Sequence, residues 1–202
     1  MSEPERFAGS TATVALVAPG RVVVAHCGDS RAVLGRRSGT ALEVTRDHRP
    51  AGRQLAAQAE AARVAATGAW VADGRVMGVL AVSRAFGDFE FKAGRDTFLA
   101  TGAKQGLWPA AQAEGRVLSG APVVATPEVN EVATPPGSFE FLIIASDGLW
   151  DCITSVQAVQ FIHAELGRNG RDPAACAKKL AEHAVKRRRS QDNVAAVIVL
   201  LP

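Results

Sequence analysis

The segment 139-FEFLIIASDGLWD-151 joins an apolar run to a turn that carries a carboxylate. Phe139 to Ala145 is apolar at every position except Glu140, which predicts a buried β-strand. Asp147 and Gly148 follow at once, and an Asp-Gly pair is typical of a tight turn. Because loops at strand ends are where a rigid scaffold presents functional side chains, Asp147 is a candidate site residue.

Further extended runs occur on both sides of this segment. Thr11 to Ala18 and Arg21 to Cys27 flank Pro19-Gly20, a dipeptide that favours a tight turn between two strands. The other strands that we expect cover residues 31–34, 41–45, 76–82, 129–133 and 194–201.

Three segments have the period of an amphipathic helix. From Gln54 onward, apolar residues at 55, 59, 62 and 66 predict an inner face, with Glu60 and Arg63 off that face. Thr154 and Gln157 fit a capping box that opens a helix through residue 166. Asp172-Pro173 fits the start of another helix that runs to about residue 185. Many strands and few helices predict sheets packed on each other and flanked by helices.

The composition is that of one globular domain. The 202 residues are 48% hydrophobic and 21% charged, which excludes a wholly disordered chain. A formal net charge of +3 is too small to predict a nucleic-acid-binding protein. The longest apolar run, 194–201, is less than half of the ~20 residues that a spanning helix requires, and the first residues do not form a secretory signal. We therefore expect a single domain over residues 1–202 of an intracellular protein, cytoplasmic or nuclear, with no membrane partner.

Two other features are interpreted as structural. Cys27, Cys152 and Cys176 form no CxxC motif and favour buried, reduced thiols. The basic run Lys186–Arg189 suits the end of a helix, where cations interact well with the helix dipole. An import signal or a patch for an anionic partner is the alternative for this run.

Three aspartates lie where a predicted strand meets a turn. Asp29 follows the strand that ends at Cys27, Asp147 follows the strand that ends at Ala145, and Asp192 precedes the last strand. Hard cations such as Mg²⁺ and Mn²⁺ prefer clustered carboxylate oxygens and water, so these residues could form a metal site. Aspartate is also a common turn and cap residue, and the spacing alone leaves both interpretations open.

Seven short blocks appear in a fixed order along the chain. They are GSTA (9–12), HCGDSRA (26–32), RDHRP (46–50), GVLAVSRAFGD (78–88), PEV (127–129), ASDGLWD (145–151) and QDN (191–193). Together they resemble the metal-dependent PPM family of Ser/Thr protein phosphatases, also called protein phosphatase 2C. The resemblance runs from Gly9 to Leu200, nearly the whole chain.

The resemblance implies an α+β fold in which two antiparallel sheets form a β-sandwich between helices, a four-layer αββα arrangement. It implies that residues 88–121 form an irregular, flap-like segment beside the metal cleft. The reaction that the resemblance implies is the hydrolysis of phosphoserine and phosphothreonine in phosphoprotein substrates by water activated on Mg²⁺ or Mn²⁺. The resemblance assigns Asp147 and Asp192 as metal ligands and Asp29, with Asp151 as its companion, to a weaker metal. Ser30, Arg31, Arg84 and Asp88 match positions where Arg-Asp pairing would hold the loops under the site.

One family block has no counterpart. Members carry Asp-Gly-His-Gly upstream of Gly-Ser-Thr, with a metal-bridging Asp and a His proposed as proton donor. Only eight residues precede Gly9 here, and none of the four histidines replaces that His. We therefore expect a domain whose N-terminal strands and first helix are missing, and we assign no catalytic residue.

Three functions follow from these observations. The first is a metal-dependent protein phosphatase whose activity in this chain is impaired by the loss of Asp-Gly-His-Gly. The second is a catalytically dead relative that binds phosphoproteins or regulators. The third, a nucleic-acid-associated protein, has only the Lys186–Arg189 run in its favour, and we expect no nucleic-acid partner.

Overall fold

A computed structural model describes residues 8–168 and 170–202. The chain forms two compact units. The first unit comprises residues 8–12, 27–29 and 47–127, and the second comprises 13–26, 30–46 and 128–202.

The second unit contains two β-sheets. Strands β2 (Ala12–Ala18), β3 (Arg21–Cys27) and β9 (Glu128–Ala133) form a three-stranded sheet in that order. Strands β4 (Arg31–Arg36), β5 (Ala41–Glu43), β10 (Phe139–Ala145) and β11 (Ala196–Leu200) form a four-stranded sheet in the order β11-β10-β4-β5. All four registers that join β10 to β11, β10 to β4, β4 to β5 and β3 to β9 are antiparallel.

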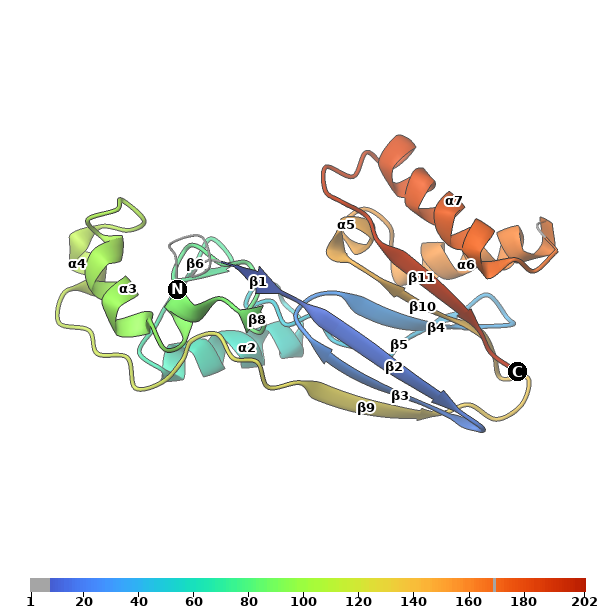
Figure 1. Cartoon of the computed structure of the whole chain (residues 1–202), viewed down its shortest axis with the longest axis horizontal. Coiled ribbons are helices and arrows are strands. Elements are labelled where there is room, and N and C mark those ends of the chain that lie inside the picture. The colour runs from blue at the N-terminus through green and yellow to red at the C-terminus, as the bar shows by residue number, and fades with distance from the viewer. Residues whose placement is uncertain (1–7, 169) are drawn as a thin grey trace. The chain divides into compact units, whose positions relative to one another are not determined.

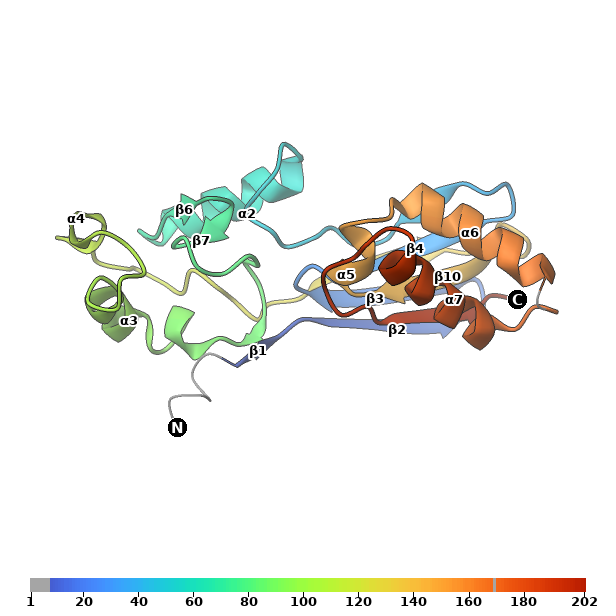
Figure 2. The same cartoon turned by 90° about the horizontal axis from the view of Figure 1, so that it is seen from above.

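The second unit has two apolar cores. One lies between the two sheets, and the other lies between the four-stranded sheet and the helices that cover it. Val22 and Val24 of β3 pack with Leu34 of β4 and Leu142 of β10, because alternate residues of each strand point between the sheets. On its other face, the four-stranded sheet carries α6 (Ser155–Arg168) and α7 (Pro173–Lys186). Figures 1 and 2 show these two helices on one side of β10 and β11, with β2, β3 and β9 on the other. The α+β class and the antiparallel sheets are confirmed.

Both predicted helix starts are confirmed in atomic detail. Thr154 N–H donates to Gln157 Oε1 at 3.1 Å, and Gln157 N–H donates to Thr154 Oγ1 at 3.2 Å, which is a reciprocal capping box. Asp172 Oδ1 accepts from the backbone N–H groups of Ala174 and Ala175 at the start of α7. The Lys186–Arg189 run is exposed and begins at the last residue of α7, as expected of a solvated helix end.

The first unit is built from short elements around its own core. Its helices are α2 (Leu55–Ala66), the 3₁₀ turn η1 (Phe89–Phe91), α3 (Arg95–Gly102) and α4 (Ala110–Ala113). Its strand pairs are β1 (Gly9–Ser10) with β8 (Phe86–Gly87), and β6 (Val71–Ala72) with β7 (Arg75–Val76). Phe98 and Trp108 pack edge to face with ring centroids 5.2 Å apart, and buried Val64 and Met77 belong to the same core.

The predicted inner face of α2 is wrong. Leu55 is 83% exposed, whereas Ala57, Glu60 and Val64 are buried. The helix turns Glu60 inward because two arginines pair with its carboxylate, an arrangement that a pattern of apolar residues cannot reveal.

Two further expectations need correction. The extended run predicted over 76–82 ends at Val76, because Met77 and Gly78 adopt positive φ angles of 53° and 74° and turn the chain. Residues 88–121 are not wholly irregular, since they contain η1, α3 and α4. Their apolar residues Phe91, Phe98, Leu99 and Trp108 are spaced too unevenly to show a period, yet all four are buried.

The cysteines and the helix lengths were also considered at the level of sequence. Cys27 and Cys176 are buried, Cys152 is half-buried, and none of the three forms a disulfide. No helix in the described part of the chain is long and apolar enough to cross a membrane.

Candidate metal site

Asp147 begins the short helix α5 (Asp147–Trp150) directly after β10. The preceding residue, Ser146, joins this turn to the segment before β11. Ser146 N–H donates to the Ala195 carbonyl at 3.0 Å, and Ala195 N–H donates to Ser146 Oγ at 3.1 Å. These bonds fix the position at which the chain leaves the sheet and presents Asp147.

The segment that carries Asp192 packs against Gly148, the residue that follows Asp147. A Cβ atom at Gly148 would lie 2.3 Å from the Asn193 carbonyl oxygen and 3.4 Å from Asp192 Cβ. Ser190 Oγ donates to the Gly148 carbonyl at 2.7 Å. The turns that carry Asp147 and Asp192 are therefore in contact although they are distant in the sequence, as the resemblance implied.

The three carboxylates of the second unit differ in exposure. Asp147 is half-buried, whereas Asp151 and Asp192 are exposed. Asp192 Oδ1 accepts from Asn193 N–H at 2.7 Å, which orients that carboxylate. In the described part of the chain, the ligand atoms of these three residues do not all lie within 4.8 Å of one another.

This donor set fits a hydrated Mg²⁺ or Mn²⁺ ion. The ligands are hard oxygens, and partial exposure leaves room for the water molecules that Mg²⁺ keeps in most protein sites. A compact cage in which three carboxylates bind one ion directly is not formed by these side-chain positions.

Arg31 packs against the turn that carries Asp147 and Trp150, in line with the structural role expected for it. Its guanidinium lies 5.3 Å from the centroid of the Trp150 ring and donates to Ser155 Oγ at 3.1 Å. Glu43 is a carboxylate partner of Arg31, at 3.3 Å. Trp150 Nε1–H donates to the Ala145 carbonyl at 2.9 Å, so α5 is fixed to the end of β10.

Asp29 belongs to the first unit and is buried. Its Oδ2 atom lies 2.7 Å from Arg49 Nε in an ion pair. The neighbouring backbone is also fixed, because Gly28 N–H donates to His48 Nδ1 at 3.1 Å and His48 N–H donates to the Gly28 carbonyl at 3.0 Å. A metal role for Asp29 stays a prediction, and the contact described here is structural.

Comparison with known proteins identifies the family. The family model described as Protein phosphatase 2C matches residues 2–194. Protein phosphatase 2C 57 of Arabidopsis thaliana is 41% identical over 196 residues, which cover 97% of this chain and 50% of that protein. The chain belongs to the protein phosphatase 2C family.

Solved structures show the same fold. A sex-determining protein of C. elegans superposes with a TM-score of 0.70 at 25% identity, covering 96% of this chain and 40% of that one. A phosphatase from Toxoplasma gondii superposes with a TM-score of 0.64 at 26% identity, covering 91% of this chain and 50% of that one. The chain therefore spans about half the length of the curated relative and solved structures that it matches.

In this phosphatase 2C chain, the Gly9 block and the Gly87-Asp88 block are neighbours. A Cβ atom at Gly9 would lie 2.1 Å from Asp88 Oδ2, so a larger residue at position 9 would require the Asp88 carboxylate to move. Lys92 Nζ donates to the carbonyls of Ala85 and Gly87, at 2.7 and 2.5 Å. Burial raises the pKa of Asp88 and lowers the pKa of Lys92. These contacts place Asp88 against the Gly9 block, and the Arg-Asp pairing expected at this position stays a prediction.

Glu60 is a buried charged residue that the apolar pattern of the sequence does not reveal. Its carboxylate lies 2.6 Å from Arg84 Nη2 and 3.1 Å from Arg63 Nη2, and Ser83 Oγ donates to it at 2.6 Å. Burial acts to raise the pKa of Glu60, but the hydrogen bonds from Arg84, Ser83 and Arg63 outweigh it and lower the pKa to about 2. The spacing of Glu60 and Arg63, three residues apart on a helix, was the signal for part of this network.

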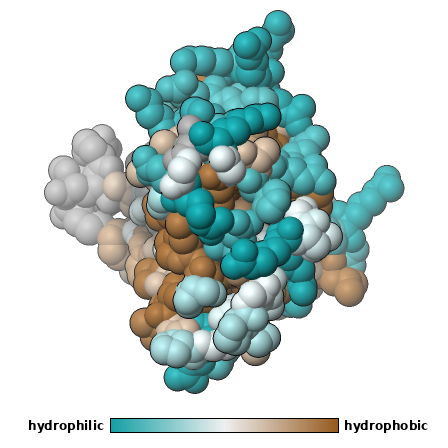
Figure 3. Space-filling view, turned by 90° about the vertical axis from the view of Figure 1, so that its right-hand side faces the viewer, coloured by the Kyte–Doolittle hydropathy of each residue, from teal (hydrophilic) through white to brown (hydrophobic). Residues whose placement is uncertain are grey.

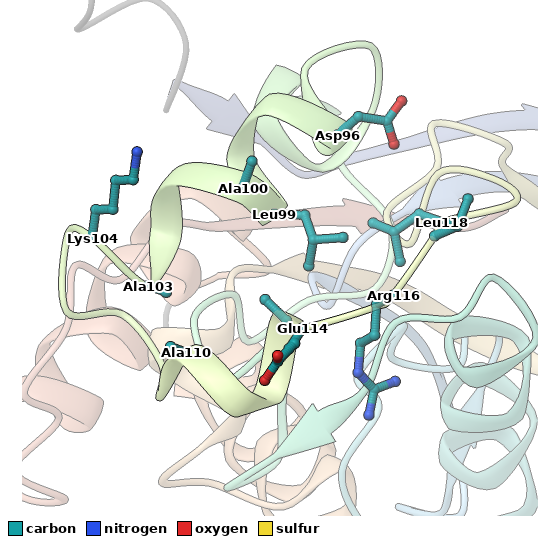
Figure 4. A pocket seen from close by; sticks show the side chains of 11 residues that line it. Asp96, Leu99, Ala100, Ala103, Lys104, Ala110, Glu114, Arg116 and Leu118 are labelled. Atoms are coloured by element: carbon teal, nitrogen blue, oxygen red, sulfur yellow. The ribbon is translucent and has the colours of Figure 1, made fainter.

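A pocket of about 690 Å³ lies between α3, α4 and residues 116–118 of the first unit. Figure 4 shows Leu99 and Leu118 directed toward this pocket. Its charged lining residues are Asp96, Lys104, Glu114 and Arg116. Arg116 is engaged elsewhere, because it donates to the carbonyls of Gln112 and Gly68.

Proposed function

We propose that this chain hydrolyses phosphoserine and phosphothreonine in proteins with the help of Mg²⁺ or Mn²⁺, at a rate below that of longer family members. The contact between the Gly148 turn and the Asp192-Asn193 segment carries the proposal, because it brings two aspartate-bearing turns together. Membership of the protein phosphatase 2C family supports the reaction type.

Asp147 and Asp192, with Asp151 nearby in the same turn, are the residues that would hold the ion. A bound divalent cation supplies an activated water nucleophile and charge stabilisation for a phosphoryl group. Ser146 and Ser190 hold the two turns together through the bonds to Ala195 and Gly148. Trp150 and Arg31 keep α5 at the end of β10.

The expected weakness has an electrostatic origin. The 202 residues contain no Asp-Gly-His-Gly block, so no bridging carboxylate from that block is present. Two unit charges 4 Å apart repel by roughly 4 kcal/mol at an effective dielectric constant of 20, and divalent ions repel more. Because that repulsion is not offset, the site should hold one ion weakly rather than two ions tightly.

The direct test is calorimetric titration with Mn²⁺ together with hydrolysis of a phosphothreonine peptide with and without Mn²⁺. We expect one weak site and slow, Mn²⁺-dependent release of phosphate. Asp192→Asn should weaken Mn²⁺ binding at least about tenfold, because it removes a charged ligand at an exposed site. Asp73→Asn, at an exposed residue of the first unit, is the matched control and should bind Mn²⁺ like the unchanged chain.

Several outcomes would contradict the proposal. Hydrolysis that persists in EDTA, or that Asp192→Asn leaves unchanged, would refute the assigned ligands. Two tight sites with rapid turnover would refute the impairment.

A binding module without turnover is the second candidate function. The absence of the Asp-Gly-His-Gly block favours it. A labelled phosphopeptide that binds the Mn²⁺-loaded chain but is not hydrolysed over many hours would select this alternative.

A further inference from the structure

The basic run Lys186–Arg189 leads directly into the segment that carries Asp192. Helix α7 ends at Lys186, and only Ser190 and Gln191 separate Arg189 from Asp192. Three residues of extended chain span at most about 11 Å, so the Cα atoms of Arg189 and Asp192 are no farther apart than that. The basic run and the Asp192 segment of the proposed metal site are therefore neighbours within the second unit.

Hydrogen bonds hold the backbone and one side chain of this run in place. Ser190 N–H donates to the Ala184 carbonyl at 3.0 Å, which closes the chain onto the end of α7. The Ser190 hydroxyl donates to the Gly148 carbonyl at 2.7 Å. Arg188 Nη2 donates to Gln157 Oε1 at 2.5 Å. The run is therefore connected to the turn that follows β10 on one side and to the first turn of α6 on the other.

Two arginines of the run carry charges that the described part of the chain does not neutralise. Lys186 pairs with Glu182 at 3.1 Å. Arg187 and Arg189 are exposed, and among residues 8–168 and 170–202 no side-chain hydrogen bond or ion pair engages either guanidinium. The upper part of Figure 3, where Figure 1 places α6 and α7, is largely hydrophilic. These two guanidinium groups are therefore available to an anion from solution.

Arg189 adopts a backbone conformation that favours glycine. Its φ angle is 57°, in the left-handed region, where the Cβ atom of other residues lies too close to the neighbouring backbone. Strained residues of this kind cluster at functional sites. Glycine would fit this turn with less strain, so the turn geometry alone gives no reason for an arginine at position 189.

We propose that Arg187 and Arg189 bind acidic groups that flank the phosphorylated residue of the substrate, so that this chain prefers acidic phosphosites. The inference rests on the proposed function, which places the phosphoryl group at the ion held by Asp147 and Asp192. A guanidinium forms strong, often paired hydrogen bonds with a carboxylate or with a phosphate. The groups that would be recognised are therefore aspartate, glutamate or a second phosphorylated residue.

The short distance along the chain from Arg189 to Asp192 limits where the acidic group can lie. A residue two or three positions from the phosphorylated residue is about 7–11 Å away in an extended peptide. This distance is similar to the upper limit for the separation of Arg189 from Asp192. We therefore expect the acidic group two or three positions from the phosphorylated residue.

Three phosphothreonine peptides test this preference. The first carries aspartate two and three positions away on both sides, the second carries asparagine there, and the third carries a second phosphate at one of these positions. With Mn²⁺, we expect kcat/KM for the aspartate peptide to exceed that for the asparagine peptide about tenfold, because exposed ion pairs are individually weak and several must act together. The preference should shrink as NaCl rises from about 50 to about 300 mM, since salt screens exposed charges. The larger of the preferences for the two anionic peptides identifies carboxylate or phosphate as the favoured group.

Arg189→Gly separates binding from structure. Glycine relieves the left-handed conformation, so we expect this variant to unfold at the same or a higher temperature while its preference for the aspartate peptide falls to about threefold. Arg187→Gln combined with Arg189→Gln should remove the preference. Arg37→Gln is the matched control and should keep it. Arg37 is exposed and directly follows the end of β4 that pairs with Phe139, whereas the other end of β4 pairs with Ala145 beside the site.

Fluorescence anisotropy with the same labelled peptides and Mn²⁺ separates this inference from the proposed function. If no peptide is hydrolysed but the aspartate peptide binds more tightly than the asparagine peptide, and the double variant loses that difference, the proposed function is refuted and the acidic preference is supported. Hydrolysis of all three peptides with equal kcat/KM and equal binding would overturn the preference alone.

Two further results would overturn the inference. One is a preference for the aspartate peptide that the double variant retains in full. The other is a DNA duplex that binds more tightly than the aspartate peptide and loses its binding in the double variant, which would assign the basic run to a nucleic acid instead.

Discussion

A single hydrogen atom in place of a side chain decides whether the two aspartate turns can meet. Gly148 is buried, and the Asn193 carbonyl occupies the space where its Cβ would be. The need for glycine at this position comes from close approach of two backbones and not from a special φ angle.

We predict that Gly148→Ala lowers the free energy of unfolding by about 2 kcal/mol, as overpacking does, and weakens Mn²⁺ binding. Gly167→Ala is the control, because a Cβ at Gly167 in α6 meets nothing within 4 Å. That change should be neutral or should stabilise the helix by up to about 1 kcal/mol. Urea denaturation measures both, and equal effects of the two changes would contradict the role given to Gly148.

Glu60 couples stability to pH. Because its pKa in the folded chain, about 2, lies below the ordinary value of 4.5, the folded state is stabilised above pH 4.5. This stabilisation, about 3 kcal/mol, is lost as the pH falls from 4.5 through 2.

We therefore expect Glu60→Gln to cost about 3 kcal/mol at pH 7 and to flatten the decline of stability below pH 4.5. Glu182→Gln removes an exposed ion pair with Lys186 and serves as the comparison, with an expected change below about 1 kcal/mol. Denaturation curves between pH 2 and pH 7 follow both. An unchanged pH profile in Glu60→Gln would show that the ion-pair network is not formed in solution.

At the scale of elements, helix ends were easier to predict than helix faces. The capping box of α6 and the Asp-Pro start of α7 involve neighbours in the sequence, so residue types alone specify them. The inner face of α2 depends on Arg84, which is far away along the chain, and the apolar pattern pointed to the wrong side.

The start of α7 provides a test at this scale. Asp172→Ala removes the acceptor for two backbone N–H groups and should cost about 1 kcal/mol of stability. Asp172→Asn keeps an oxygen acceptor and should cost only a few tenths of a kcal/mol. If thermal unfolding shows the two variants to be equal, the cap contributes nothing and the prediction fails.

At the scale of the whole molecule, the chain divides its apolar residues among separate cores. One core lies between the two sheets of the second unit, one lies under α6 and α7, and one holds Phe98 and Trp108 in the first unit. The first two fill both faces of the four-stranded sheet. The outer face of the three-stranded sheet instead carries the exposed residues Val14, Leu16 and Val129.

The sequence by itself determined the family, most of the sandwich strands and the aspartate turns. Strands β3 and β10 have the predicted bounds, because their continuous apolar runs leave no other way to bury them. The tertiary structure alone decided the buried position of Glu60, the turn at Met77 and Gly78, the core within residues 88–121, and the approach of Gly148 to Asn193. The physical reason is the distance along the sequence between interacting residues. Caps, turns and strand periods depend on near neighbours in the sequence. Burial of a charge and contact between turns depend on partners that only folding brings close.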